Sequence, residues 1–254
     1  MKNYFTFLKK ELLESVRTYK MFILLTVFLL LGIMNPLIAK LTPEIVEMAM
    51  PAGMDITVAA PTAMDSWLQF YKNVGQIGVF VIVLVLSGML SAELSKGTLI
   101  NLLTKGLSRS AVIFAKYTYM ILMWTAGYAL SYLVTWGYTV FLFPKDNASN
   151  VLLSAFFLWV FGVFLLAVLM LGAVLSGNSY GGLLITGGVF VICMLLNMFP
   201  AVHKFNPLTL GSDNVALIQN TVKPGAFFPA VGVAGVIVVL AIAGSVMLFR
   251  KKQL

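Results

Sequence analysis

The sequence predicts an all-α, multi-pass membrane protein: a single domain over residues 1–254 with six transmembrane helices. Of the 254 residues, 60% are hydrophobic and only 10% are charged, and the mean hydropathy is +0.98. A water-soluble domain carries about 45–50% apolar and about 25% charged residues, so this composition excludes one. The apolar residues come in charge-free blocks of at least 19 residues, and a helix needs about 20 residues to cross a bilayer.

Six such blocks are the predicted spans: 21–39, 74–92, 117–143, 151–175, 181–199 and 227–249. All 17 basic and all 9 acidic residues lie outside them. Because hydrocarbon excludes charge and requires internally bonded backbone, this segregation favours helical crossings. Twelve of the 17 Lys and Arg residues fall on the side that carries both termini. This bias predicts cytoplasmic termini in a cell-membrane protein. It also explains the net charge of +8 without a nucleic-acid partner.

Residues 1–20 predict an amphipathic helix that lies on membrane lipid. Apolar residues recur at helical spacing: Phe5, Leu8, Leu12, Val16 and Tyr19. Charged residues occupy the remaining faces: Lys2, Lys9, Lys10, Glu14 and Arg17. Such a helix rests in the headgroup plane, with its cations attracted to anionic lipid. A generic basic membrane-entry segment is the alternative.

The loop between the second and third spans contains a second helix candidate, at 95–107. Thr98 can cap its start, Gly97 permits a tight turn before it, and Gly106 can take the left-handed C-terminal position. Three leucines share one face: Leu99, Leu102 and Leu103. A helix of about two turns is poorly stable alone, so we expect it to dock on a partner protein or on the membrane surface.

At this loop the sequence resembles the integral-membrane subunits of ATP-binding-cassette exporters of the second permease type. The order of the elements carries the resemblance, together with Glu93, Gly97, Thr98, Leu102, Leu103, Arg109 and Lys116. It implies that 95–107 is a coupling helix, framed by Glu93 and Arg109, that docks on a separate ATPase subunit. It also implies a dimer of permease subunits, with a homodimer expected, and two ATPase subunits. From the residues alone, Glu93 can pair with Lys96, Arg109 or Lys116, and Lys116 can instead anchor at the interface by snorkelling.

The energy source is expected to lie in another polypeptide. The predicted spans contain no charge, which argues against proton or sodium coupling. The chain contains no Gly-x-x-x-x-Gly-Lys-Ser/Thr loop, the backbone cradle that binds nucleotide phosphates. We therefore expect no enzyme activity, cofactor or metal site in this chain, with ATP and Mg bound by the partner ATPase.

The third span carries a polar stripe along one seam, formed by Thr118, Thr125, Tyr128, Tyr132, Thr135 and Thr139. Hydroxyls inside a membrane either bond to a neighbouring helix or line a cavity. Thr125, Tyr128, Tyr132 and Thr135 are the candidate pathway-lining residues, for an amphipathic or hydrophobic cargo such as a peptide, drug or lipid. In the first span, Asn35-Pro36 predicts a kink and a freed carbonyl.

Two outer segments are long enough to fold. We expect 40–73 to form a small cap without a metal, with Trp67, Phe70 and Tyr71 as an interfacial aromatic belt. Segment 200–226 predicts a short helix capped by Asp213 or Asn214. The family resemblance implies that this segment dips between the last two spans as an outer gate, and an interfacial loop helix is the alternative.

Two other functions compete with an exporter. The first is a non-transporting membrane scaffold or sensor subunit. The second and weaker one is an intramembrane enzyme, because Gly177–Gly181 fits the pattern Gly-x-Ser-x-Gly. That pattern needs a preceding strand and a nearby histidine. We expect it to be a turn between two spans, with the sole histidine, His203, on the opposite side.

Overall fold

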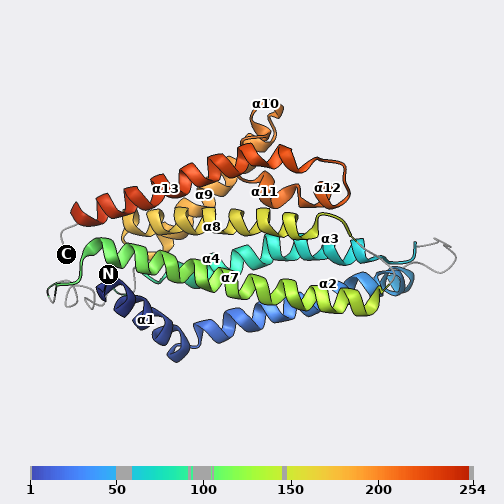
Figure 1. The fold of residues 1–254 in the computed structure, drawn as a ribbon, viewed down its shortest axis with the longest axis horizontal. Coiled ribbons are helices and arrows are strands. Elements are labelled where there is room, and N and C mark those ends of the chain that lie inside the picture. Colours follow the sequence, from blue (N-terminus) through green and yellow to red (C-terminus); the bar gives the residue numbers. More distant parts are fainter. Residues whose placement is uncertain are drawn as a thin grey trace.

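The computed structural model describes residues 2–49, 59–90, 93, 104, 106–144 and 148–251, which form an elongated helical bundle without a strand in these ranges (Figure 1). Its main helices are α1 (Lys2–Arg17), α2 (Lys20–Ala49), α3 (Ala63–Asn73), α4 (Val79–Ser87), α7 (Arg109–Leu142), α8 (Val151–Ser176), α9 (Ser179–Asn197) and α13 (Phe228–Lys251). Short elements are the π-helix η1 (Val74–Gly78), α10 (Pro200–His203), α11 (Thr209–Ser212), α12 (Asn214–Ile218) and the 3₁₀ turn η2 (Pro224–Phe227).

Five of the described helical stretches are long and apolar enough to cross a membrane. They are Lys20–Met48, Ala63–Ser87, Val151–Ser176, Tyr180–Asn197 and Pro224–Lys251. The remaining predicted span, 117–143, falls in α7, which is 34 residues long and therefore about 51 Å in length. Its many Tyr, Trp, Thr and Gly residues make it less apolar than the other five. Six crossings therefore remain a prediction.

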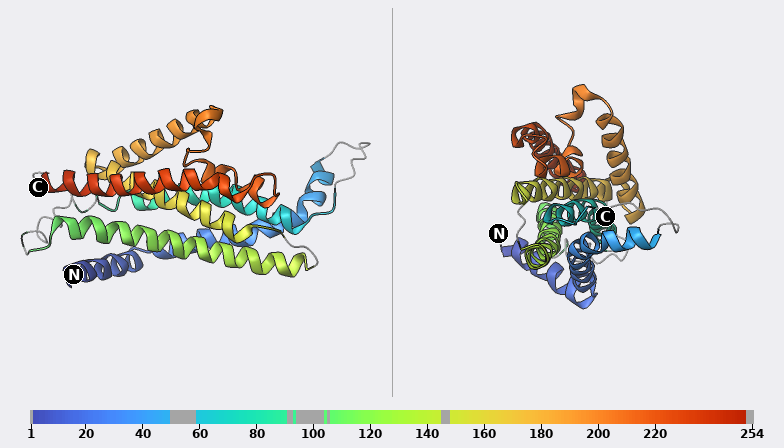
Figure 2. Two further views of the ribbon diagram at one scale, coloured as in Figure 1. Left: turned by 45° about the horizontal axis from the view of Figure 1, so that its top comes forward. Right: turned by 90° about the vertical axis from the view of Figure 1, so that its right-hand side faces the viewer.

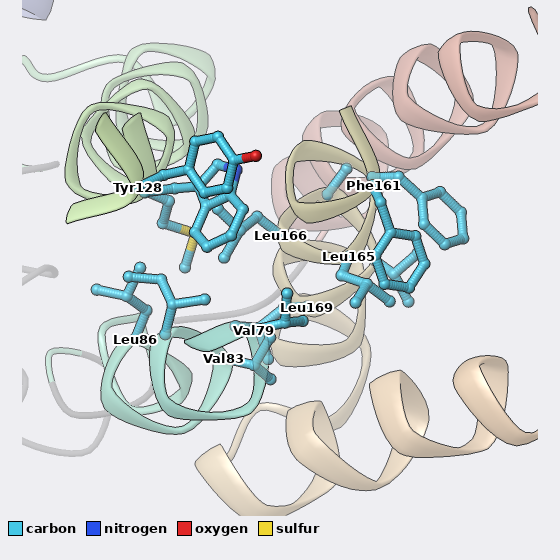
Figure 3. Packing of buried hydrophobic residues seen from close by; sticks show 14 of the residues in the cluster. Val79, Val83, Leu86, Tyr128, Phe161, Leu165, Leu166 and Leu169 are labelled. Carbon is cyan, nitrogen blue, oxygen red and sulfur yellow. The ribbon is translucent and has the colours of Figure 1, made fainter. Parts of the chain in front are cut away.

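Helix α8 lies at the centre of the bundle and is the most enclosed of the five apolar helices (Figure 2). Figure 3 shows Val79 and Val83 of α4 beside Leu169 of α8, and Leu166 between α8 and Tyr128 of α7. All of these side chains are buried. Tight packing of large side chains is costly to rearrange, because protein interiors are close to crystal density.

Aromatic side chains pack directly on glycines where helices approach closely. The Phe28 ring of α2 fits against Gly127 of α7, where a Cβ would lie 2.7 Å from the ring, and against Gly78 at 3.1 Å. The Trp124 indole of α7 covers Gly162 of α8, where a Cβ would lie 2.3 Å away. At Gly127 and Gly162 only glycine leaves room for these rings as they lie, so α2, α7 and α8 interlock.

The structure corrects the predicted outer loop 40–73. Helix α2 continues ten residues past the predicted end at Ala39, to Ala49, and the second span starts as α3 at Ala63 rather than at Val74. A capping box begins α3: the Thr62 backbone N–H and hydroxyl both donate to the Asp65 carboxylate at 2.8 Å, which satisfies donors at the helix start. The hydropathy boundary missed this start because polar residues interrupt the first turns.

The predicted aromatic belt is also wrong. Trp67, Phe70 and Tyr71 are at most 3% exposed and lie in the protein interior instead of at a lipid interface. The Trp67 ring lies 5.2 Å from that of Tyr132, and the Phe70 ring 5.7 Å from that of Tyr128. Because a helix rather than a loop carries them, their spacing directs them onto α7, where tilted aromatic contacts add to burial.

Helix α1 forms as predicted, but the face that it packs on the bundle only partly overlaps the predicted apolar face, of which Leu8 and Leu12 contact the core. Phe5 and Tyr19, from the predicted apolar face, are 63% and 69% exposed, whereas Phe7, Glu11 and Ser15 are buried. The buried face rests against α7. The helical spacing of apolar residues did not reveal this buried face, because Glu11 lies at its centre and α7, on which it packs, is distant in sequence. Its position on lipid remains a prediction.

Within segment 200–223, α11 and α12 fold back onto α8, with Leu210, Leu217 and Ile218 fully buried, whereas α10 contacts α9. The Asn206 amide donates to the Cys193 carbonyl of α9 at 2.7 Å. The predicted short helix is present as α12, but neither predicted side chain caps it. The Asn214 amide instead donates backward to Leu210. The segment is therefore packed protein, and a gating role remains a proposal.

The Gly177–Gly181 string forms a turn between α8 and α9, as expected. Gly177 takes the left-handed conformation (φ 71°), and the Asn178 side chain accepts from the Gly181 N–H at 2.6 Å. The element before this turn is a helix, whereas a nucleophile elbow follows a strand. His203 lies in α10, beyond the far end of α9.

Candidate functional site

The predicted coupling helix lies mostly outside the described residues. These omit Gly97, Thr98, Leu99, Leu102 and Leu103, so this helix remains a prediction. Its two framing residues, Glu93 and Arg109, are described. Each of them binds a part of the bundle that is remote in sequence.

Glu93 takes part in an ion cluster formed by Lys10, Glu11, Glu14, Glu93 and Lys116. The Lys116 ammonium lies 2.7 Å from Glu93 Oε2 and 2.9 Å from Glu11 Oε1, and it donates to the Met89 carbonyl at 3.1 Å. Lys10 bonds Glu93 Oε1 from the other side and pairs with Glu14 at 2.8 Å. Of the three partners that the sequence left open for Glu93, the structure shows Lys116. The cluster joins α1, the end of the second span and α7.

The alternative prediction, that Lys116 anchors at the interface by snorkelling, is wrong, because the Lys116 side chain is fully buried. Burying an ammonium group costs several kcal/mol unless carboxylates and hydrogen bonds compensate, and here two carboxylates and a carbonyl do so. Sequence reasoning missed Glu11 as a partner because 105 residues separate it from Lys116. The interrupted apolar face of residues 1–20 was the one available signal.

The pKa values of the α1 residues follow from their partners. Burial raises the pKa of Glu11 above its usual value, although Lys116 opposes this. Partial burial of Glu14 also favours its neutral form, but its hydrogen bond with Lys10 prevails and lowers the Glu14 pKa. Partial burial opposes charge on Lys10, yet bonds to Glu14 and Glu93 raise its pKa. Oxygens of the three carboxylates lie within 4.8 Å of one another, and the two ammonium groups already neutralise most of their charge.

Arg109, the other framing residue, binds the end of the last span. Its guanidinium donates to the carbonyls of Phe249 and Arg250 at 3.0 and 2.8 Å. In return, Arg250 donates to the Ser110 hydroxyl at 2.9 Å. The last carbonyls of a helix lack intrahelical donors, so a guanidinium there satisfies exposed acceptors. The segment between Glu93 and Arg109 is thus fastened at one end to α1 and α7, and at the other to α13.

The polar stripe of α7 divides between two environments. Thr135 is fully buried and donates to the Gly32 carbonyl of α2 at 3.0 Å. Gly32 lies four residues before Pro36, which has no N–H to donate, so this is the freed carbonyl that the sequence predicted. The Asn35 amide donates to Thr135 at 3.4 Å and accepts from Asn73 at 2.9 Å. Thr135 therefore joins helices and is not among the residues that line the groove between α7 and α8.

The other three candidate pathway residues, Thr125, Tyr128 and Tyr132, line a groove of about 1150 Å³ between α7 and α8. We call it the α7–α8 groove. Its remaining lining residues are Ala63, Trp67, Ala129, Leu133, Trp136, Thr139, Val140, Ala148, Asn150, Val151, Leu152, Leu153, Ala155, Phe156 and Trp159. Trp67 and Tyr128, which are 3% and 6% exposed, form its inner part. Trp136 is 54% exposed and lies at the rim.

Internal hydrogen bonds already engage most polar groups of the groove. The Tyr128 hydroxyl donates to the Ala155 carbonyl at 2.8 Å, and the Trp159 indole donates to Thr125 at 3.0 Å. Thr139 shares a 2.6 Å hydrogen bond with Ser66. Among the described lining residues none is charged. The groove thus offers mainly aromatic and aliphatic contact.

Taken together, the fold defines the chain as a helical membrane protein, with apolar helices arranged around a central one. No protein-family model matches the sequence. The chain is similar to "Uncharacterized transmembrane protein YxlG" of Bacillus subtilis (strain 168), with 24% identity over 168 residues. The match covers 63% of this chain and 64% of that relative. The chain therefore matches less than two thirds of the relative's length.

Proposed function

We propose that the chain is the permease subunit of an ATP-binding-cassette exporter of the second permease type, working as a homodimer in the cell membrane. A separate ATPase subunit binds ATP and Mg and drives translocation of a hydrophobic or amphipathic cargo. The observation that carries the proposal is the attachment of the framing residues Glu93 and Arg109 to three different helices. This attachment occurs at the loop that resembles the docking segment of the family.

The mechanism follows from these attachments. A partner that pushes on the loop after Glu93 moves α4 through the chain, and moves α7 and α1 through the ion cluster around Lys116. At the other end, Arg109 transmits the same motion to α13. Packed side chains and buried ion pairs deform little, so a displacement is passed on rather than absorbed. Alternating access then consists of rigid movement of these helices.

The topology and the groove are consistent with this proposal. Helix α1 begins and α13 ends at the same end of the bundle (Figure 1), as an even number of crossings requires. This supports α7 as the sixth span and a common side for both termini. The α7–α8 groove supplies an apolar surface for cargo, and Thr125, Tyr128 and Tyr132 line it.

Purification in mild detergent with identification of bound subunits tests the proposal. The double variant L102D/L103D should lose the ATPase subunit while still inserting in the membrane, because charge destroys an apolar docking face. The double variant L102M/L103M, which keeps the face apolar, should retain the ATPase. ATPase binding that survives both aspartates would count against the proposal.

Reconstitution separates the remaining alternatives. In proteoliposomes, the complex should move a hydrophobic probe only when ATP is hydrolysed. A complex that binds the ATPase without moving any probe would instead favour a scaffold or sensor subunit. Chemical turnover by the purified chain without its ATPase would favour an enzyme.

A further inference from the structure

We propose that the α7–α8 groove binds the hydrocarbon chain of a membrane amphiphile, which enters sideways from the bilayer. The inference deepens the proposed function, on which it rests for the idea that the bound molecule is cargo. Binding itself requires neither the ATPase nor a second copy of the chain. The occupant is defined by three features of the groove: its shape, its direction of opening and its small number of free polar groups.

The groove is long enough to hold the hydrocarbon chain of a lipid. Along α7 it extends from Thr125 to Val140, about 22 Å at 1.5 Å per residue. Half of the hydrocarbon core is about 15 Å thick, so the groove exceeds one leaflet. The antiparallel α8 forms the opposite wall from Val151 to Trp159. The groove therefore runs along the direction in which lipid chains lie.

The groove opens toward lipid rather than toward the interior. Leu133, Trp136 and Phe156 at its rim are 60%, 54% and 49% exposed. A chain that enters past them reaches Trp67 and Tyr128, whose side chains are nearly covered by protein. This depth distinguishes the site from the ordinary lipid-facing surface of a helix.

The polar groups of the groove favour a hydrocarbon chain over a peptide. A peptide backbone brings N–H and C=O groups that need partners inside a membrane. The groove has few to give, since Thr125, Tyr128 and Thr139 are already bonded within the protein and the described lining carries no charge. Among the lining hydroxyls of the described residues, that of Tyr132 has no internal partner. It can donate to one ester or hydroxyl oxygen near the head of the amphiphile.

A helix of a second copy is the competing occupant, and the test below distinguishes it from a hydrocarbon chain. A single flexible chain can follow the indented wall between α7 and α8. We therefore assign the groove to a hydrocarbon chain.

Tryptophan fluorescence provides a direct test, because three of the four tryptophans line the groove. The variant W136F/W159F retains Trp67, inside the groove, and Trp124, which is fully buried outside its lining. Titration with a lysophospholipid that carries a brominated chain should quench a saturable part of the emission. An unbrominated lysophospholipid should restore it. Adding W67F to this variant should reduce the saturable part, because Trp124 lies behind the Tyr128 ring and farther from the bound chain.

Two alanines on α7 give a matched pair of blocking variants. Ala129 and Ala126 are both exposed, but only Ala129 lines the groove. Ala129→Phe should weaken binding of the brominated chain at least tenfold, and Ala126→Phe should leave it unchanged. Normal ATPase association of the Ala129→Phe variant would show that the protein is folded, and would separate a failure here from a failure of the proposed function.

Three results would overturn the inference. One is quenching that does not saturate and is the same with and without Trp67. Another is displacement of the chain by a neutral apolar peptide as effectively as by the lysophospholipid. The third is loss of a homodimer on Ala129→Phe in native mass spectrometry, since this would show that a second copy occupies the groove.

Discussion

Replacing Lys116 with methionine would remove the fully buried cation that separates two buried carboxylates. Glu11 and Glu93 are only 4% and 6% exposed. A carboxylate oxygen of each lies less than 3 Å from the Lys116 ammonium nitrogen. Removing one partner of a buried ion pair costs about 3–5 kcal/mol, because the remaining charge stays desolvated. Lys10 still lies 3.2 Å from Glu11. The expected loss is therefore at the lower end, about 3 kcal/mol.

Thermal unfolding in detergent measures this loss. For a chain of this size 1 kcal/mol corresponds to about 2–4 °C, so Lys116→Met should lower the Tm by about 6–12 °C. Lys72→Met is the control, because Lys72 is exposed on α3, and its Tm should change by less than about 2 °C. The triple variant E11Q/E93Q/K116M should recover much of the loss, since it leaves no unpaired charge.

The pH dependence of the Lys116→Met variant follows from the same geometry. Burial already raises the pKa of Glu11, and Lys116 opposes that rise, so the variant should raise it further. An acid whose pKa is higher in the folded state destabilises the fold as pH rises through that pKa, and the fold regains stability as pH falls. The deficit of Lys116→Met should therefore shrink on acidification from neutral pH. A Tm equal to that of Lys72→Met, or a deficit that grows in acid, would refute the reasoning.

Two further substitutions test the packing of the spans. Thr135→Val leaves the Gly32 carbonyl without its donor and should cost about 1 kcal/mol of stability. In a Pro36→Ala background, which restores a backbone N–H, the same substitution should lower the Tm by less. An equal loss of Tm in both backgrounds would contradict the role assigned to Thr135. Gly162→Ala places a Cβ 2.3 Å from an indole ring and should cost about 1–3 kcal/mol. In Gly137→Ala the added Cβ has no neighbour within 4 Å, so the Tm should stay unchanged or rise slightly. Equal Tm values for the two glycine variants would disprove the close approach of Trp124 to Gly162.

Local patterns predicted much of the bundle and one of its internal contacts. Five of the six charge-free blocks overlap helical stretches that are apolar enough to cross a membrane, because burial in lipid is decided by composition over about 20 residues. Pro36 predicted a freed carbonyl because its missing N–H affects a residue at a known offset. The hydroxyl stripe of α7 was visible in the spacing, but the spacing left helix packing and cavity lining open.

Hydropathy and helical periodicity by themselves determined that this chain is a helical membrane protein and which segments are apolar enough to cross. Tertiary structure alone decided that Thr135 bonds α2 while Tyr128 and Tyr132 line a groove, and that Trp67 faces the interior. It also chose Glu11 as the second carboxylate partner of Lys116 and the Phe249 carbonyl as a partner of Arg109, which lie 105 and 140 residues away. The physical reason is that hydropathy is a sum over neighbours in the chain, whereas ion pairs and hydrogen bonds form between whichever groups the packing of distant helices brings within about 3 Å.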